Sequence, residues 1–245
     1  MIEPTANKFI ALLVIIAAPF AMGAFFLAWS PAQQYSLTDP SRDGYVPPRE
    51  IGVMVENTQR STVSVFCDAP KKEVMGSAWA VKLDEKAYAQ YANVFITNHH
   101  VIRDCIGKER YLTVARLFAK QIKARIITVD KKNDLAVLVA DVKIPSLQLA
   151  LSPPYPGYWS MLVGSADSYE GSVAFGSVLN NTATEVLVTT TASHGNSGGP
   201  VVDNEGRVIG TLTSGADGEQ YNVAMSLDAM CSKILKCKGK YFWDW

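Results

Sequence analysis

The sequence predicts an all-β fold of two six-stranded antiparallel β-barrels with a short C-terminal helix, preceded by an N-terminal transmembrane helix. Twelve short runs rich in β-branched and aromatic residues fall into two groups of six, the strand count that two barrels need. A Pro-rich connection at residues 144–158 separates the two groups. An uncharged apolar stretch at residues 9–29 precedes them.

The apolar stretch is long enough to cross a membrane. As a helix, residues 9–29 would extend about 31 Å, which matches a hydrocarbon core. The alternative is a cleaved signal peptide with small residues at 30–32 as its cleavage site, although the apolar region of such peptides is usually shorter. Pro19 and Gly23 argue against a buried helix of a soluble domain. We assign residues 1–30 to a membrane anchor or signal segment and favour the anchor.

The rest of the chain is interpreted as a linker and one domain. Residues 31–50 are rich in Pro, Ser, Asp and Gly without hydrophobic periodicity, which is typical of a tether. The domain then covers residues 51–245. Within it we expect barrel one at about 51–141, barrel two at about 155–226, and a C-terminal helix with a tail at 227–245.

The predicted strands are short and are separated by charged or Gly-containing turns. In barrel one they cover residues 61–66, 77–83, 94–97, 111–117, 122–129 and 135–140. In barrel two they cover residues 159–164, 172–179, 185–191, 201–202, 207–214 and 221–226. Met230, Ile234 and Leu235 recur at helical spacing, which predicts the terminal helix.

Composition excludes several classes of function. The chain has 23 basic and 23 acidic residues, so it lacks the positive charge that nucleic-acid binding needs. Three histidines and the lack of a CxxC pair leave too few clustered ligands for a metal site. We therefore predict no metal, no cofactor and no nucleic-acid partner.

The most informative motif is the Gly-rich string Gly-Asn-Ser-Gly-Gly-Pro at residues 195–200. A serine hydroxyl becomes a nucleophile when it is exposed and a neighbouring base deprotonates it. The flanking glycines permit a sharp turn and close approach of a substrate carbonyl. In such a turn the amides of Gly195 and Ser197 converge on one point, where an oxyanion would form. A plain Gly-rich turn is the alternative interpretation.

A histidine and a carboxylate precede this serine in the chain. His99 and His100 follow the apolar run at 94–96, at the end of a strand where a ring faces a cleft. Asp134 begins the apolar run at 135–140, so its carboxylate is expected to be partly buried, as a group that orients an imidazole should be.

The three strings TNHHVI, NDLAVL and GNSGGP, in the order His, Asp, Ser, resemble the signatures of the chymotrypsin-like (trypsin-like) serine protease superfamily. The chain is most similar to the HtrA/DegP-like branch over roughly residues 60–226, without a PDZ-like domain after the barrels. No IVGG-like segment is present, so we do not expect activation by a new amino terminus.

The resemblance implies a Ser-His-Asp triad and an acyl-enzyme mechanism. The histidine directly before the valine matches the family's base, so His100 is the base and His99 the reserve candidate. Ser197 is then the nucleophile, Asp134 the orienting acid, and the amides of Gly195 and Ser197 the oxyanion hole. Asp130 and Asp141 are interpreted as solvated turn residues.

The resemblance also implies a substrate pocket. Its floor falls on Thr191, an uncharged residue, which argues against selection for Lys or Arg because a buried cation without a partner is costly. The small residues Thr213, Ser214 and Gly215 form its wall. His194 stands where the HtrA branch often has proline, so we expect a freer loop or simply a surface histidine.

The four cysteines indicate disulfides and an oxidising compartment. By resemblance to relatives that bracket the catalytic histidine with a disulfide, we favour a bond between Cys67 and Cys105. Cys231 and Cys237 then pair by default. The second bond requires the helix to end before Cys237, because six helical residues separate two side chains by about 9 Å along the axis. Free buried thiols are the alternative.

The sequence thus predicts a serine endopeptidase that acts on protein or peptide substrates outside the cytoplasm. It is either anchored in a membrane through residues 9–29 or secreted after signal-peptide cleavage. The rival hypothesis is a catalytically silent two-barrel module that binds peptides or partners. The oligomeric state is not indicated by the sequence.

Overall fold

The computed structural model describes residues 43–70, 72–82, 92–215, 220–235 and 237. Among them, no helix combines the length and apolar character needed to cross a membrane. The apolar stretch at residues 9–29 lies outside the described residues, as does most of the expected linker.

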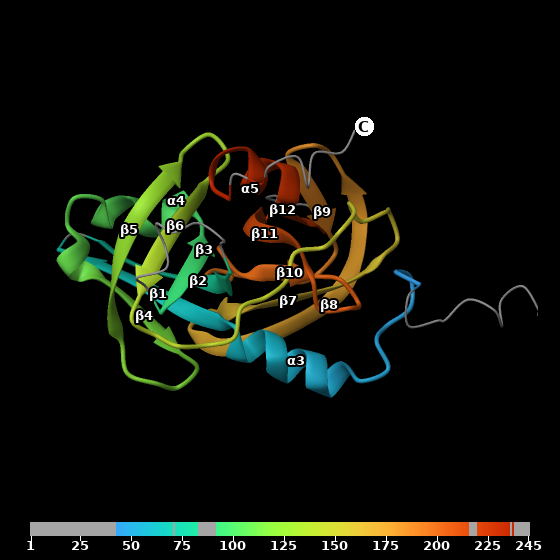
Figure 1. Cartoon of the computed structure of the whole chain (residues 1–245), viewed down its shortest axis with the longest axis horizontal. Helices are drawn as coiled ribbons and strands as arrows, with labels where there is room; N and C mark the ends of the chain where they lie inside the picture. The colour runs from blue at the N-terminus through green and yellow to red at the C-terminus, as the bar shows by residue number, and fades with distance from the viewer. Residues whose placement is uncertain (1–42, 71, 83–91, 216–219, 236, 238–245) are drawn as a thin grey trace, which may run out of the picture. The chain divides into compact units, whose positions relative to one another are not determined.

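The first barrel is a closed antiparallel sheet in the order β1-β2-β3-β6-β5-β4 (Figure 1). Its strands are β1 (Thr62–Ala69), β2 (Lys72–Val81), β3 (Asn93–Thr97), β4 (Leu112–Arg116), β5 (Ile122–Asp130) and β6 (Leu135–Ala140). Between β3 and β4 lie a short helix α4 (His99–Ile102) and two 3₁₀ turns (Arg103–Cys105 and Glu109–Tyr111).

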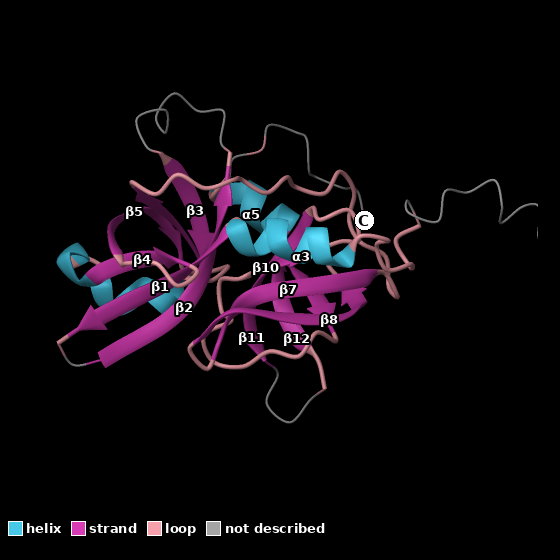
Figure 2. Ribbon diagram, turned by 90° about the horizontal axis from the view of Figure 1, so that it is seen from below, coloured by secondary structure: helices cyan, strands magenta, loops and turns pink. Residues whose placement is uncertain are grey.

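The second barrel closes in the order β10-β11-β12-β9-β8-β7. Its strands are β7 (Trp159–Ala166), β8 (Tyr169–Asn181), β9 (Glu185–Val188), β10 (Pro200–Val202), β11 (Val208–Gly215) and β12 (Asn222–Ser226), followed by helix α5 (Leu227–Lys233). Figure 2 shows the strands in these two groups. The predicted fold of two six-stranded antiparallel barrels and a short C-terminal helix is therefore confirmed.

Each predicted run contains a strand, but one of them ends early. We expected a strand at 185–191, whereas β9 ends at Val188. The following threonines have high β-propensity, and the Thr189 N–H still donates to the Ser177 carbonyl of β8 at 2.9 Å. The strand nevertheless ends, and Thr189 and Thr190 begin the loop that leads to Ser197.

A helix precedes the first strand where the sequence analysis placed the start of barrel one. Helix α3 (Ile51–Arg60) contacts β1 and β7 and packs Met54 and Val55 against the core of barrel two. The sequence pattern of a helix was present, because Ile51, Met54, Val55 and Thr58 recur at helical spacing. The polar residues between them resemble the preceding tether, so the helix was missed.

Three strands of barrel one are buried on both faces. Along β6, Ala136, Leu138 and Ala140 pack into the interior of barrel one, while Leu135, Val137 and Val139 pack into the core shared with barrel two. Strands β2 and β3 alternate in the same way. Two-sided burial explains why residues 135–140 form a continuous apolar run and not an alternating one.

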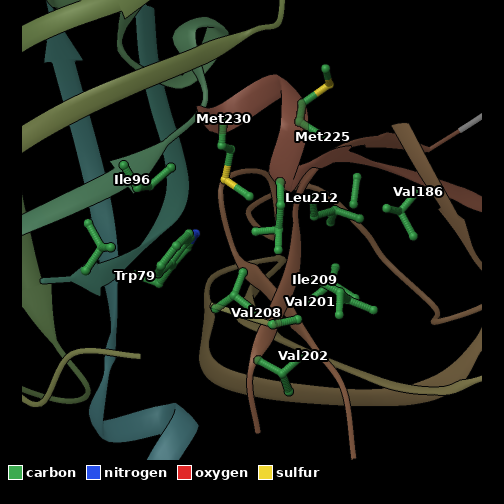
Figure 3. Close-up of a cluster of buried hydrophobic side chains, with 14 of the residues drawn as sticks. Trp79, Ile96, Val186, Val201, Val202, Val208, Ile209, Leu212, Met225 and Met230 are labelled. Carbon is green, nitrogen blue, oxygen red and sulfur yellow. The ribbon is translucent and has the colours of Figure 1, made fainter. Parts of the chain in front are cut away.

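The core between the barrels is centred on a tryptophan from β2. Trp79 is fully buried, and its indole N–H donates to Thr211 Oγ1 of β11 at 3.0 Å. Figure 3 shows Trp79 and Ile96 beside Leu212 of β11 and Met230 of α5. Apolar burial with a satisfied indole N–H fixes one barrel against the other.

Both predicted cysteine pairings are present as disulfides. Cys67 in β1 is bonded to Cys105, and Cys231 in α5 is bonded to Cys237. The second bond forms because α5 ends at Lys233, before Cys237. The Ser226 side chain caps the start of this helix by accepting from the Ala229 N–H at 3.2 Å.

Asp130 is buried, so its interpretation as a solvated turn residue was wrong. Its side chain is 1% exposed. Its carboxylate accepts from Asn133 Nδ2 at 2.6 Å and from the Lys132 N–H at 3.1 Å, and Lys233 of α5 lies 3.4 Å away. The turn after β5 folds back over this carboxylate and supplies its partners. Asp141 is exposed, as predicted.

We predict that the two disulfides stabilise the fold unequally. They close loops with sequence separations of 38 and 6 residues, for which loop entropy gives about 4 and about 2 kcal/mol. Urea unfolding of C67A/C105A and of C231A/C237A should therefore show the larger loss in the first pair. A larger loss in the second pair would contradict this ranking.

Candidate active site

The predicted triad residues meet at the interface of the two barrels. His100 lies in α4, directly after β3, and Asp134 directly precedes β6. Ser197 lies in the loop between β9 and β10 of the other barrel. Because β3 pairs with β6 in antiparallel register, the end of one strand and the start of the other bring His100 and Asp134 together.

The His100–Asp134 pair is closely hydrogen-bonded. His100 Nδ1 lies 2.6 Å from Asp134 Oδ2, and the His100 backbone N–H donates to Asp134 Oδ1 at 2.9 Å. The Asp134 carbonyl in turn accepts from Asn98 Nδ2 and from the His99 N–H. Asp134 has a φ of 49°, a left-handed conformation that costs energy for a residue with a side chain. These contacts hold it there.

Hydrogen bonds keep the Asp134 carboxyl ionised. Burial by itself raises the pKa of this group, but the hydrogen bonds from His100 and Thr213 outweigh burial, and the pKa lies below its usual value. An ionised Asp134 can only accept, so His100 Nδ1 is the donor of the hydrogen bond between them. In the tautomer that this contact favours, the hydrogen lies on Nδ1 and Nε2 is the acceptor of the ring.

Thr213 links the acid to the serine. Its hydroxyl donates to Asp134 Oδ2 at 2.5 Å, and its carbonyl accepts from Ser197 Oγ at 3.2 Å. The register of β11 against β12 shifts between Leu212 and Ser214, and such a bulge changes the direction of the side chain within it. The Ser197 hydroxyl is bonded to this carbonyl, and among the described residues it makes no hydrogen bond to His100.

The amides of Gly195 and Ser197 are the predicted oxyanion donors. In the part of the chain that the structure describes, neither N–H has a hydrogen-bond partner. Gly195 has a φ of 93°, and a Cβ there would lie 2.1 Å from the Ser165 carbonyl oxygen. Only glycine fits this position without displacing the β7–β8 turn.

Neighbouring carbonyls fix the direction of both amides. The His194 carbonyl accepts from the Asp167 N–H at 2.6 Å, and the Asn196 carbonyl accepts from the Gly199 N–H at 2.9 Å. In a trans peptide the N–H points opposite to the C=O. The amides of Gly195 and Ser197 therefore point away from these partners.

The structure separates the residues predicted for the substrate pocket. Thr191 lines a cavity of about 190 Å³ together with Ala192, Ser193, Asn196 and residues of β7 and β8. Neither Thr213 nor Gly215 lines this cavity, and the Thr213 side chain is bonded to Asp134 instead of forming a pocket wall. The Ser214 side chain lies outside the described residues.

The other two histidines take no part in the His100–Asp134 pair. Burial lowers the pKa of His99, whose Nε2 is buried without a partner among the described residues, and this outweighs the opposite effect of Asp134. His99 thus stays neutral near pH 7. His194 is exposed, and its backbone carbonyl accepts from the Asp167 N–H.

Sequence reasoning missed two buried hydroxyl residues beside the site. Ser77 of β2 contacts the loop of Ser197, and Thr97 of β3 donates to the Ser77 carbonyl at 2.7 Å. The available signal was Gly76 next to Ser77 within a strand, because a strand glycine often marks close approach of another backbone segment. A Cβ at Gly76 would lie 3.1 Å from the Ser197 carbonyl oxygen.

Comparison with known proteins agrees with the resemblance found in the sequence. The family model of the trypsin-like peptidase domain matches residues 76–210. The uncharacterized protein y4bJ of Sinorhizobium fredii is 34% identical over 50% of this chain and 20% of its own length. A probable periplasmic serine endoprotease, DegP-like, of Pseudomonas savastanoi is 30% identical over 61% of this chain and 34% of its own length. The chain thus spans 20% and 34% of the length of these two relatives.

Two solved structures share the fold. The serine endoprotease from Yersinia pestis has a TM-score of 0.66 at 21% identity and covers 78% of this chain and 67% of its own. The active form of the Rv3671c protease from M. tuberculosis has a TM-score of 0.63 at 18% identity, over 78% of this chain and 88% of its own. At these identities the likeness supports the two-barrel fold alone.

The lowered pKa of Asp134 predicts a pH-dependent contribution to stability. A carboxyl with a folded-state pKa below its unfolded value stabilises the fold fully above the unfolded pKa, and this contribution is lost as the pH falls through the folded value. The difference in unfolding free energy between wild type and Asp134→Asn should therefore be constant near neutral pH and shrink below about pH 4. Urea unfolding across this range measures it, and a difference that stays constant throughout would contradict the assignment.

Proposed function

Because the chain belongs to the trypsin-like peptidase family, we propose that it is a serine endopeptidase with Ser197 as nucleophile, His100 as general base and Asp134 as the orienting acid. The observation that carries the proposal is the 2.6 Å contact between His100 Nδ1 and Asp134 Oδ2. Thr213 joins the same carboxylate to Ser197, and a hydrogen on Nδ1 leaves Nε2 as the acceptor of the ring. The unpartnered amides of Gly195 and Ser197 beside the serine support it.

Catalysis in this arrangement begins when the Ser197 hydroxyl leaves the Thr213 carbonyl. It then donates its proton to His100 Nε2 as Oγ bonds to the substrate carbonyl carbon. The oxygen of that carbonyl becomes an oxyanion, which the amides of Gly195 and Ser197 stabilise. The C–N bond then breaks as His100 returns the proton to the leaving amine. Water attacks the acyl carbon while His100 Nε2 takes its proton, and this proton passes to Ser197 Oγ as the carboxylic acid product leaves.

A catalytically silent binding module is the second candidate. One observation favours it, because Ser197 Oγ is bonded to the Thr213 carbonyl and not to His100. Catalytic hydrogen bonds are often absent in unliganded enzymes and form with substrate, and a rotation about one side-chain bond moves a serine hydroxyl. The intact His100–Asp134 pair makes the endopeptidase the stronger candidate.

We further propose that the domain acts outside the cytoplasm, in the cell envelope or beyond it. Two disulfides join all four cysteines, and such bonds persist in oxidising compartments. The DegP-like relatives are named as periplasmic. Residues 9–29 would anchor the chain in the membrane, or would be removed as a signal peptide. Residues 1–30, 31–50 and 51–245 then form the anchor or signal, the linker and the protease domain.

The first test is labelling of the full chain with a fluorophosphonate probe, which reacts with activated serines. Wild type should be labelled, whereas Ser197→Ala and His100→Ala should not. Asp134→Asn should lower the labelling rate by about 10⁴-fold, since the imidazole tautomer is no longer fixed. A folded, oxidised wild-type chain that resists the probe would support the binding module.

Substrate selection is the second test. Thr191 borders a cavity whose described lining residues carry no charge, so a Lys or Arg side chain would find no anion there. In a mixed peptide library, cleavage after uncharged residues should exceed cleavage after Lys or Arg by about tenfold or more. Preferred cleavage after a basic residue would remove Thr191 from the proposed pocket.

A further inference from the structure

Ser77 connects three parts of the candidate site. It lies in β2 of barrel one with no exposed surface. Its N–H donates to the Ser197 carbonyl at 2.8 Å, its hydroxyl donates to the Gly195 carbonyl at 2.7 Å, and its own carbonyl accepts from Thr97 Oγ1 at 2.7 Å. One residue of the first barrel thus binds the oxyanion loop of the second, beside the segment that leads to His100.

The bond to Gly195 bears on the geometry of the oxyanion hole. The Gly195 carbonyl belongs to the peptide unit that lies between the two proposed donor amides, those of Gly195 and Ser197. Rotation of this middle peptide changes the angle between the donors. The two outer peptides are held by backbone groups, through Asp167 and Gly199. The middle one has two contacts. Its N–H, that of Asn196, donates to the Ser193 carbonyl within the same loop at 3.2 Å, and its carbonyl accepts from the Ser77 hydroxyl of the other barrel.

The carbonyl of the middle peptide depends on the contact with Ser77. Gly195 has a φ of 93°, and a glycine has several other conformations open to it. The Gly195 residue is buried, so a carbonyl that lost its donor would be left unsatisfied unless the loop moved. The close fit extends to Gly198, where a Cβ would lie 2.1 Å from the Ser77 carbonyl oxygen.

We propose that Ser77 is a positioning residue for the oxyanion hole, whose hydroxyl fixes the Gly195 carbonyl and so directs the amides of Gly195 and Ser197 at one point. The inference rests on the proposed function, in which these two amides stabilise the oxyanion. It adds that the hole is complete only when the two barrels are docked, because its third anchor comes from barrel one.

The test compares Ser77→Ala with Ser61→Ala in the full chain. Ser61 is a matched control, because it is also buried and donates one hydroxyl bond to a backbone carbonyl, that of Asn57, at 2.9 Å. The rate constant for fluorophosphonate labelling should fall roughly 10- to 100-fold in Ser77→Ala, since the donors are misaligned but not removed. It should change less than about twofold in Ser61→Ala.

A second readout separates the hole from the His100–Asp134 pair. The proton on His100 Nδ1, bonded to a carboxylate, gives a far-downfield signal in a proton NMR spectrum, and Ser77→Ala should retain it. Ser77→Cys keeps a donor at this position, although the thiol is a weaker donor and a larger group than the hydroxyl, and should be labelled at a rate between those of wild type and Ser77→Ala. If Ser77→Ala does not fold, Ser77→Cys replaces it as the test variant. Ser77→Cys must then be labelled more slowly than wild type.

The outcomes separate the two proposals. Labelling of Ser77→Ala as fast as that of Ser61→Ala would overturn the positioning role and leave the proposed function intact. Loss of the His100 signal in Ser77→Ala would also overturn it, because the effect would then extend beyond the hole. A wild-type chain that is not labelled overturns the proposed function itself.

Discussion

The packing of one barrel against the other is the contact on which the rest of this structure depends. Strands β2, β3 and β6 bury one face inside barrel one and the opposite face in the core shared with barrel two. The same three strands carry or adjoin Ser77, His100 and Asp134. Apolar burial along these strands therefore places the proposed base and acid beside the loop of Ser197, which belongs to the other barrel.

Two buried or half-buried carboxylates near this interface are each satisfied by several donors. Asp134 accepts from the His100 side chain, the His100 backbone and Thr213, and Asp130 accepts from Asn133, Lys132 and Lys233. Unpaired buried charge is costly, so the turn between them, which carries Asp134 in a left-handed conformation, is held at both ends. The donors that satisfy these two carboxylates thus also hold the proposed acid, Asp134, in place.

Strand positions followed from the sequence because β-branched and aromatic runs were separated by clear turn residues. All twelve strands were anticipated for this reason. Helix α3 was not, since its apolar positions are spaced among polar residues that resemble the linker before it. The end of β9 was misjudged because threonine propensity does not report where a chain leaves its ladder.

The sequence by itself determined the chemical groups and their order, because GNSGGP, TNHHVI and NDLAVL specify residue types at short spacings. It also determined the number of strands, whereas the pairing of the cysteines came from the family resemblance. Only the tertiary structure decided which atoms meet. Ser77 reaches Gly195 across 118 residues, Thr213 turns to Asp134 at a bulge in β11, and Asp130 becomes buried under its own turn. Such contacts depend on strand register and barrel docking, and no local pattern of residues encodes either.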